Sequence, residues 1–335
     1  MDLPNPELSR EMMLDIFWTM LISRRTDERA WVLHRQGKIA FHVSAIGHEA
    51  IQVGAGFALQ RGRDFVAPYY RDLALMFALG MTPLEFVLGL MGKRDEPTSG
   101  GRQMPSHWSF RRANVISHSA PVATQTSHAA GLGLAIKLKK DDRVVLTTVG
   151  EGSTAQGEWY EGVNWAAIHQ LPVVFLIENN RYAISSPQER EMAVKSVAEK
   201  ACGLGLPGVS VDGTDVFSVY RVVKEAVDRA RRGGGPTVIE ALAYRITPHS
   251  SDDDDRSYRT REEVEEHKKK DPLLIARTYL ETRGILSADA YRELEDRARK
   301  MVEEAIRQAG EAPYPDPEEG LYPVYAEQIR EVGHA

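Results

Sequence analysis

Residues 144 to 177 contain a strand, a helix and a second strand in succession, and this pattern constrains the fold more than any other part of the chain. The β-branched run at 144–149 is followed by Gly-Glu-Gly, then by a helical stretch at 158–169 and a second apolar run at 171–177. Two strands that are joined by a helix pair in parallel, with the helix on a face of the sheet. The pattern predicts an α/β fold with a mostly parallel sheet and helices on both faces.

The remainder of the chain extends this alternation and then becomes helical. Residues 12–22 are apolar on nearly every face and indicate a buried helix. Apolar residues recur at helical spacing over 216–230, and the strand that follows is expected at 237–246. Because no linker or repeat divides the sequence, we expect a single domain over residues 1–335, with roughly 260–335 as a helical C-terminal extension.

Charge and composition exclude several classes of protein. The chain has 42 Lys and Arg against 48 Asp and Glu, a net charge of −6, so it has no basic field to attract nucleic acid. Cys202 is the only cysteine, which excludes an intramolecular disulfide and a multi-cysteine metal cluster. The start of the chain lacks a secretory signal, and the uncharged stretch at 113–136 contains histidine and amide side chains that are costly in lipid. We therefore expect a cytoplasmic protein that binds neither nucleic acid nor membrane.

Polar residues follow the two strands of the unit described first. Gly150-Glu151-Gly152 is separated from Asn179-Asn180 by 26 residues, and each group falls at the carboxyl end of an expected strand. Parallel strands would bring these ends together, and a helix that begins just after Gly152 would direct amide N–H groups at a phosphate. Mg²⁺ prefers oxygen ligands, and Glu151 offers a carboxylate and Asn180 a side-chain carbonyl. Each motif alone is usually an ordinary turn, but both in one unit are more specific.

The segment from Gly150 to Ser185 resembles the thiamine diphosphate motif in the alpha subunits of 2-oxo acid dehydrogenases, which is Gly-Asp/Glu-Gly followed, after a helix and a strand, by Asn-Asn. The resemblance covers nearly the whole chain and is closest to the branched-chain members. It implies the thiamine diphosphate-binding fold. Six further segments match that family in the same order: GHEAIQVG (47–54), PYYRD (68–72), GRQMP (101–105), SAPVATQ (119–125), VDGTDVFSVY (211–220) and YRITPHSSDDDDRSYR (244–259).

The resemblance also implies which residues hold the cofactor. Mg²⁺ would be held by the side chains of Glu151 and Asn180 and by the main-chain carbonyl of Tyr182. The family often has aspartate at the position of Glu151, whereas branched-chain members commonly have glutamate. Tyr70 and Arg71 match the pair that grips the diphosphate, a phenol donor and a planar guanidinium that can bind phosphate through two hydrogen bonds. The implied cofactor-binding set is Tyr70, Arg71, Val122, Gly150, Gly152, Ser153, Asn180 and His249.

His249 is the residue of this chain that the resemblance assigns to catalysis. The matching histidine lies over the thiazolium ring and helps to move protons during transfer to the lipoyl group, a task that suits a side chain titrating near neutral pH. Ser250 matches a serine that is phosphorylated in mitochondrial relatives. The loop around the cofactor is expected to be held by ion pairs and hydrogen bonds among Arg245, Asp253, Tyr258 and Arg259. A K⁺ site is implied at Ser119, Pro121, Thr124 and Gln125.

Members of the family with two chains take the glutamate that activates thiamine from a beta subunit. The resemblance therefore implies an α₂β₂ heterotetramer that is inactive without its beta subunit. Its further partners are a small 2-oxo acid substrate and a lipoyl-bearing acyltransferase.

Several alternatives for the function remain open. GRQMP, Glu151 and PHSSDDDD favour branched-chain 2-oxo acids, whereas ENNRY and the residues near Gln156 favour pyruvate or acetoin. A transketolase-like enzyme shares the metal motif but usually has both cofactor-binding domains in a much longer chain. A non-catalytic assembly subunit has no physical need for the intact set of Glu151, Asn180, Arg71 and His249.

Overall fold

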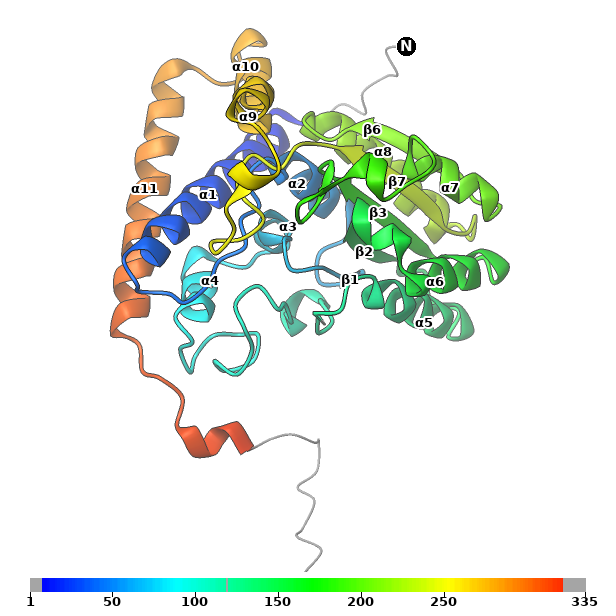
Figure 1. Cartoon of the computed structure of the whole chain (residues 1–335), viewed down its shortest axis with the longest axis horizontal. Helices are drawn as coiled ribbons and strands as arrows, with labels where there is room; N and C mark the ends of the chain where they lie inside the picture. Colours follow the sequence, from blue (N-terminus) through cyan, green and yellow to red (C-terminus); the bar gives the residue numbers. More distant parts are fainter. Residues whose placement is uncertain (1–7, 119, 322–335) are drawn as a thin grey trace, which may run out of the picture.

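The centre of the molecule is a five-stranded sheet, seen in a computed structural model that describes residues 8–118 and 120–321 (Figure 1). Neighbouring strands are parallel throughout this sheet, which confirms the arrangement expected from the sequence. A short antiparallel hairpin, β4 (Tyr182–Ala183) and β5 (Ser186–Pro187), follows its third strand. In spatial order the strands of the sheet are β1 (Phe65–Ala67), β2 (Val145–Gly150), β3 (Val173–Asn179), β7 (Thr237–Leu242) and β6 (Gly208–Asp212).

Helices cover both faces of the sheet because alternate strand residues point into two separate hydrophobic clusters. On β3, Val174 and Leu176 belong to the larger cluster, whereas Val173 and Phe175 belong to the smaller one. The larger cluster is completed by α1 (Arg10–Arg35), α2 (Glu49–Ala58), α3 (Leu73–Ala78), α4 (Pro83–Leu90) and α8 (Val216–Arg231). The smaller is completed by α5 (Thr124–Leu138), α6 (Gly157–Ile168) and α7 (Val197–Gly203).

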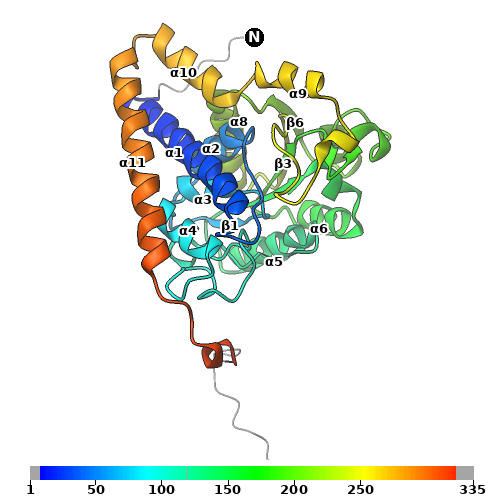
Figure 2. The ribbon, with the colours of Figure 1, turned by 60° about the vertical axis from the view of Figure 1, so that its left-hand side comes forward.

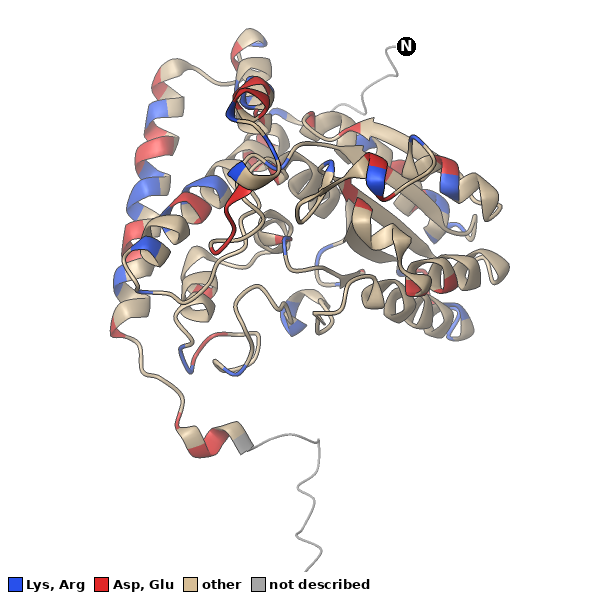
Figure 3. Cartoon of the chain, viewed as in Figure 1, with Lys and Arg blue, Asp and Glu red and all other residues tan. Residues whose placement is uncertain are grey.

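The C-terminal part of the described chain is helical, as expected. It contains α9 (Arg261–Lys268), α10 (Pro272–Thr282) and α11 (Ala288–Glu311), and each helix begins where the side chain of Thr260, Asp271 or Ser287 accepts a backbone N–H. The last helix packs along α1 and α4 (Figure 2). Its exposed side carries charges of both signs (Figure 3). No helix within the described ranges is long and apolar enough to cross a membrane.

Two expectations about the ends of elements were wrong. The strand expected at 237–246 ends at Leu242, because the partner strands β3 and β6 also end there, at Asn179 and Asp212, and leave nothing further to pair with. The helix expected just after Gly152 is a 3-10 turn over Glu151–Ala155, and α6 starts only at Gly157. Between them Gln156 has an extended backbone, which interrupts the helical hydrogen bonds.

Candidate cofactor site

The carboxyl ends of β2 and β3 bring Glu151 and Asn180 together. Gly150 pairs with Glu178 in the last register of the two strands, so the residues that follow them emerge side by side. The Oε2 atom of Glu151 accepts a hydrogen bond of 3.1 Å from the backbone N–H of Asn180. The Oδ1 atom of Asn180 accepts one of 3.2 Å from the N–H of Tyr182. The juxtaposition predicted from the sequence is thus present in the fold.

The second oxygen of Glu151 is unsatisfied. Glu151 is 1% exposed, and its Oε1 atom has no hydrogen-bond partner among the described residues. Burial raises the pKa of this carboxyl to about 7. A buried acceptor without a donor is unfavourable, and a divalent cation would supply the missing partner.

Oxygen atoms of several kinds would have to complete such a metal site. The described residues contain no cluster of three or more His, Cys, Asp or Glu that could hold a metal ion. The carbonyl of Tyr182 accepts a hydrogen bond of 3.1 Å from Arg245, but a carbonyl oxygen has a second lone pair. One carboxylate, one amide oxygen and one main-chain carbonyl suit Mg²⁺, which keeps several waters or phosphate oxygens as further ligands.

The guanidinium of Arg71, which follows the carboxyl end of the parallel strand β1, is buried and has no counter-ion among the described residues. Arg71 is 1% exposed, and no carboxylate forms an ion pair with it among the described residues. Its Nη1 atom donates to the carbonyl of Ser44 at 2.6 Å, its Nη2 atom lies 3.3 Å from the carbonyl and from Nδ1 of His249, and its Nε atom is unpartnered. Because buried charges are normally paired, Arg71 is suited to bind an anion.

Two histidines flank the ring of Tyr70. The ring of His249 lies edge-on to Tyr70 at 6.0 Å between centroids, and that of His118 at 6.3 Å. Burial, with the charges of Arg71 and Arg245, lowers the pKa of His249 to about 3. Burial and the neighbouring His107 lower that of His118 to about 4. Both rings are therefore neutral at pH 7. The sequence did not indicate His118, because a single histidine in a loop has no pattern that marks it.

Acid should destabilise the folded chain through these two histidines. Their pKa values lie below the ordinary value of about 6.5, so between that pH and about 4 the unfolded chain binds protons that the folded chain does not. The stability present above the ordinary pKa is then lost as the pH falls. We expect the urea midpoint to drop between about pH 7 and about pH 5, and to drop less in a His118→Gln, His249→Gln double variant. An equal drop in both proteins would contradict this assignment.

The loop that carries His249 has several hydrogen bonds and an ion pair within itself. The backbone N–H of His249 donates to Oδ2 of Asp253 at 2.8 Å, and the same oxygen accepts from the hydroxyl of Tyr258 at 2.5 Å. Arg245 donates to that hydroxyl at 2.9 Å. Arg259 forms an ion pair of 2.6 Å with Asp255, a residue that the sequence prediction did not include. The predicted network among the four residues is thus present, with Asp255 added.

The remaining predicted residues fall into two groups. Ser153 is buried in the 3-10 turn after Glu151, whereas Val122 is 40% exposed before α5. In the implied K⁺ loop, the hydroxyl of Thr124 donates to Glu158 at 2.8 Å, and Gln125 keeps a buried Oε1 without a partner. Pro121 is exposed at the same turn. Ser119 lies outside the described residues.

Gly152 and Gly157 differ in the space around them, which gives a matched pair of substitutions. A Cβ at Gly152 would lie 2.4 Å from the Cβ of Ala183, whereas a Cβ at Gly157, exposed at the start of α6, meets nothing within 4 Å. Gly152→Ala should therefore displace β4, which includes Tyr182, and weaken binding of thiamine diphosphate by roughly tenfold, about 1.4 kcal/mol. Gly157→Ala should bind nearly as tightly as wild type. Equal dissociation constants for the two variants would contradict the expectation.

A buried polar cluster around Glu178, which contacts the backbone of Arg71 through Gln52, was not predicted from the sequence. Oε2 of Glu178 accepts from His48 at 2.7 Å, from Gln52 at 3.0 Å and from the hydroxyl of Tyr69 at 2.9 Å. Gln52 also donates to the carbonyl of Arg71 at 3.1 Å. Although burial acts to raise the pKa of Glu178, these donors lower it overall. The members come from three separate segments, so no local motif could reveal them.

Comparisons with known proteins agree with this geometry. Residues 18–318 match the family model of the dehydrogenase E1 component. The chain is 49% identical over 319 residues to the 2-oxoisovalerate dehydrogenase subunit alpha of Bacillus subtilis (strain 168), across 95% of this chain and 97% of that relative. It is 37% identical over 305 residues to the pyruvate dehydrogenase E1 component subunit alpha of Staphylococcus aureus (strain Mu50 / ATCC 700699), across 91% of this chain and 80% of that relative. The chain therefore belongs to the dehydrogenase E1 component family.

Proposed function

We propose that this chain is the alpha subunit of a 2-oxo acid dehydrogenase that acts on branched-chain 2-oxo acids in the cytoplasm. It would work as an α₂β₂ heterotetramer with a beta subunit and transfer the acyl group to the lipoyl group of an acyltransferase. The proposal rests on two buried groups that follow the carboxyl ends of strands in the sheet. Among the described residues, the guanidinium of Arg71 has no counter-ion and the Oε1 atom of Glu151 has no hydrogen-bond partner. An anionic cofactor bound together with a divalent cation satisfies both.

The residues fit thiamine diphosphate and Mg²⁺. Glu151 Oε1, the side-chain oxygen of Asn180 and the carbonyl of Tyr182 would hold Mg²⁺, while Arg71 and Tyr70 would hold the diphosphate. When bound, thiamine diphosphate supplies a carbon nucleophile and an electron sink for decarboxylation. The backbone of Gly150, Gly152 and Ser153 would approach the diphosphate, and Val122 would support the aminopyrimidine. Gln125, through its unpartnered Oε1 atom, would bind K⁺ together with Ser119, Pro121 and Thr124.

His249 would present one nitrogen to the substrates. Arg71 is only a donor, so Nδ1 of His249, at 3.3 Å from it, is the acceptor nitrogen of the ring and Nε2 carries the proton. The Nε2–H group would hydrogen-bond to the incoming lipoyl sulfur. His249 would exchange a proton more readily once Arg71 held a diphosphate, because one of the positive charges that lower the pKa of His249 would then be offset.

The branched-chain substrate is supported by the relatives. The 2-oxoisovalerate dehydrogenase subunit matches over nearly its full length and at higher identity than the pyruvate dehydrogenase subunits. The second candidate, pyruvate or acetoin, is favoured by the ENNRY segment at 178–182 and by the residues near Gln156. Selectivity among these acids is worth only about 1–3 kcal/mol per methylene in an apolar pocket, so a direct assay is needed.

The test is reduction of an artificial electron acceptor by the chain co-purified with its beta subunit, thiamine diphosphate and Mg²⁺. The substrates are 3-methyl-2-oxobutanoate, 4-methyl-2-oxopentanoate, pyruvate and acetoin. We expect clear preference for the two branched acids and no activity without the beta subunit. Preference for pyruvate or acetoin would overturn the substrate assignment, and a stable complex that is inactive with all four would favour an assembly subunit.

A further inference from the structure

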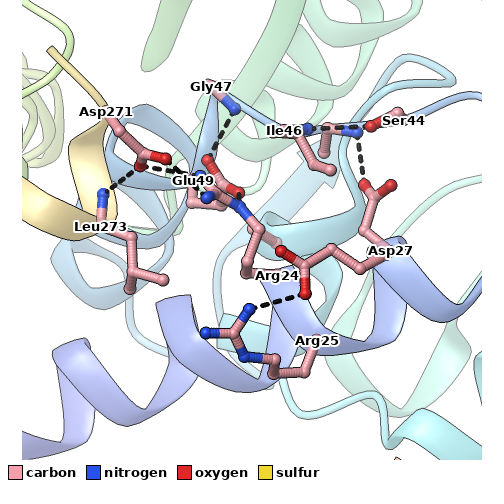
Figure 4. Close-up of polar contacts among 12 residues, drawn as sticks. Arg24, Arg25, Asp27, Ser44, Ile46, Gly47, Glu49, Asp271 and Leu273 are labelled. Carbon is pink, nitrogen blue, oxygen red and sulfur yellow. Dashed lines mark hydrogen bonds and ion pairs between the residues drawn. The ribbon is translucent and has the colours of Figure 1, made fainter. Parts of the chain in front are cut away.

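Residues 42–47, called the 42–47 segment below, lie between helix α1 and the proposed cofactor site. On the side of α1, Asp27 accepts a hydrogen bond of 2.6 Å from the N–H of Ala45, next to Ser44 (Figure 4). Asp27 also contacts Nε2 of His42 at 2.8 Å. On the other side, the carbonyl of Ser44 accepts from Nη1 of Arg71 at 2.6 Å. The segment therefore connects a helix residue to the guanidinium that would hold the diphosphate.

The same segment is bonded to the loop that carries His249. The N–H of His42 donates to Oγ of Ser251 at 3.0 Å, and the N–H of Ser251 donates to the carbonyl of His42 at 2.9 Å. One bond ends on the side-chain hydroxyl of Ser251 and the other on the main-chain carbonyl of His42, and together they hold these two residues side by side. Any shift of the 42–47 segment is thus transmitted to Arg71 and to the loop of His249 together.

The far end of the segment is fixed by a buried ion network. Glu49 accepts a hydrogen bond of 2.8 Å from the N–H of Gly47 and pairs with Arg24 at 2.5 Å (Figure 4). Arg24 also forms two bonds, of 2.7 and 2.9 Å, to Asp271 at the start of α10. Gly47 has a φ of +100°, and a Cβ there would lie 2.3 Å from the carbonyl of Tyr244, so the segment can move little at this end. Its other end depends on Asp27.

Asp27 is an unusual residue for a purely structural position. It is 1% exposed in the middle of α1, and among the described residues no lysine or arginine forms an ion pair with it. Both of its carboxylate oxygens are used on the 42–47 segment. An apolar side chain would pack in a helix interior without the cost of burying a carboxylate, so the hydrogen bonds to the segment are what this aspartate provides.

We propose that Asp27 is a positioning residue for the cofactor site, acting through the 42–47 segment on both Arg71 and the loop of His249. This inference rests on the proposed function. The hydrogen bonds of the Asp27 carboxylate among the described residues are with the 42–47 segment, and Asp27 would act through that segment. It sets where the carbonyl of Ser44 and the backbone of His42 lie, and these two groups hold the guanidinium and the loop.

The test compares Asp27→Leu and Asp27→Asn in the complex with the beta subunit. Leucine has a similar size but makes no hydrogen bond, whereas the asparagine oxygen still accepts from Ala45 and its NH₂ group can donate to His42. Asp15→Leu is the matched control, because Asp15 is an exposed residue on the same helix. Two quantities are measured, the dissociation constant for thiamine diphosphate with Mg²⁺ and the trypsin cleavage after Arg256, an exposed arginine in the His249 loop, at saturating cofactor.

We expect Asp27→Leu to raise the dissociation constant about tenfold or more, because both buried hydrogen bonds to the 42–47 segment are lost, and to leave Arg256 cleavable although cofactor is bound. Asp27→Asn and Asp15→Leu should bind and protect like wild type. A merely structural role would lower the melting temperature of Asp27→Leu without changing cleavage at saturation. Wild-type affinity and protection in Asp27→Leu would overturn the proposal.

A second variant decides the matter if Asp27→Leu fails to fold. Ser251→Ala removes the bond from the N–H of His42, together with a 3.5 Å contact from the same hydroxyl to Asp252, and leaves α1 untouched. It should increase cleavage after Arg256 at saturating cofactor, and unchanged cleavage would overturn the proposal. If the wild-type complex binds no thiamine diphosphate at all, the proposed function fails instead, and that result is recognised before any variant is compared.

Discussion

Replacement of Glu151 by glutamine should abolish cofactor-dependent decarboxylation while the complex with the beta subunit stays intact. Glutamine keeps an oxygen for the N–H of Asn180 but turns an NH₂ group toward the position where Oε1 now lacks a partner. A cation cannot bind there. Even residues that only support metal ligands change affinity by about 10–100-fold, so we expect a loss of at least about a hundredfold for a direct ligand.

The same variant should be more stable than wild type without cofactor. Burial raises the pKa of Glu151 to about 7. At pH values between the ordinary pKa of a glutamate and about 7, the folded chain therefore keeps a proton on Glu151 that the unfolded chain has lost. The stability that this proton gives is lost as the pH rises through about 7, so at about pH 8 the wild-type protein bears an ionised, unpaired buried carboxylate. Glutamine carries no charge. A higher melting temperature together with lost cofactor binding would be the signature of a site built for a cation.

Isothermal titration with thiamine diphosphate and Mg²⁺, and thermal melting at about pH 8, measure the two effects. Glu161→Gln, at an exposed position on α6, is the matched control and should change neither. If Glu151→Gln bound the cofactor with wild-type affinity, Glu151 would not be a metal ligand. If it were less stable than wild type at this pH, the carboxylate would have an unrecognised partner.

The parts of the site that the sequence predicted are those formed within one local unit. Glu151 and Asn180 each follow an apolar run, and the rule that parallel strands end at one edge is enough to bring them together. The end of β7 was missed because it depends on where β3 and β6 stop, which is a property of the neighbours and not of the strand itself. Tertiary packing sets such ends, and propensity does not.

The missing parts of the site are those assembled from distant segments. Asp27 and His42 belong to sequences that look like an ordinary helix and an ordinary loop, and only the fold places the first beneath the second. The sequence likewise cannot show that Arg71 lacks a counter-ion, because any carboxylate along the chain could fold next to its guanidinium. The family resemblance pointed to Arg71 and His249 as site residues. The fold adds that the two side chains are in contact, and that burial and the charge of Arg71 keep the imidazole of His249 neutral.

Substitution of His249 should separate the two half-reactions of the complex. His249→Ala leaves Glu151, Asn180 and Arg71 in place, so cofactor binding and reduction of an artificial acceptor should persist in large part. Transfer of the acyl group to the lipoyl domain should fall by at least about a hundredfold, the lower range for a positioned proton-transfer group. His249→Gln, which keeps an N–H donor but cannot exchange a proton, should recover little of this loss. Full recovery with glutamine would show that His249 only positions the lipoyl sulfur.

The pH profile of lipoyl acylation gives the sharper form of this prediction. Burial disfavours the imidazolium of His249 even where a diphosphate offsets the charge of Arg71, so the acidic limb of the wild-type profile should lie below the pH at which an ordinary histidine titrates. In His249→Gln that limb should be absent, because no group remains there to take up a proton. The rates are measured with the free lipoyl domain as acceptor, under single-turnover conditions, so that product release does not hide the step. An acidic limb that persists unchanged in the variant would assign the titration to another group, and His118, on the opposite side of Tyr70, would be the next histidine to substitute.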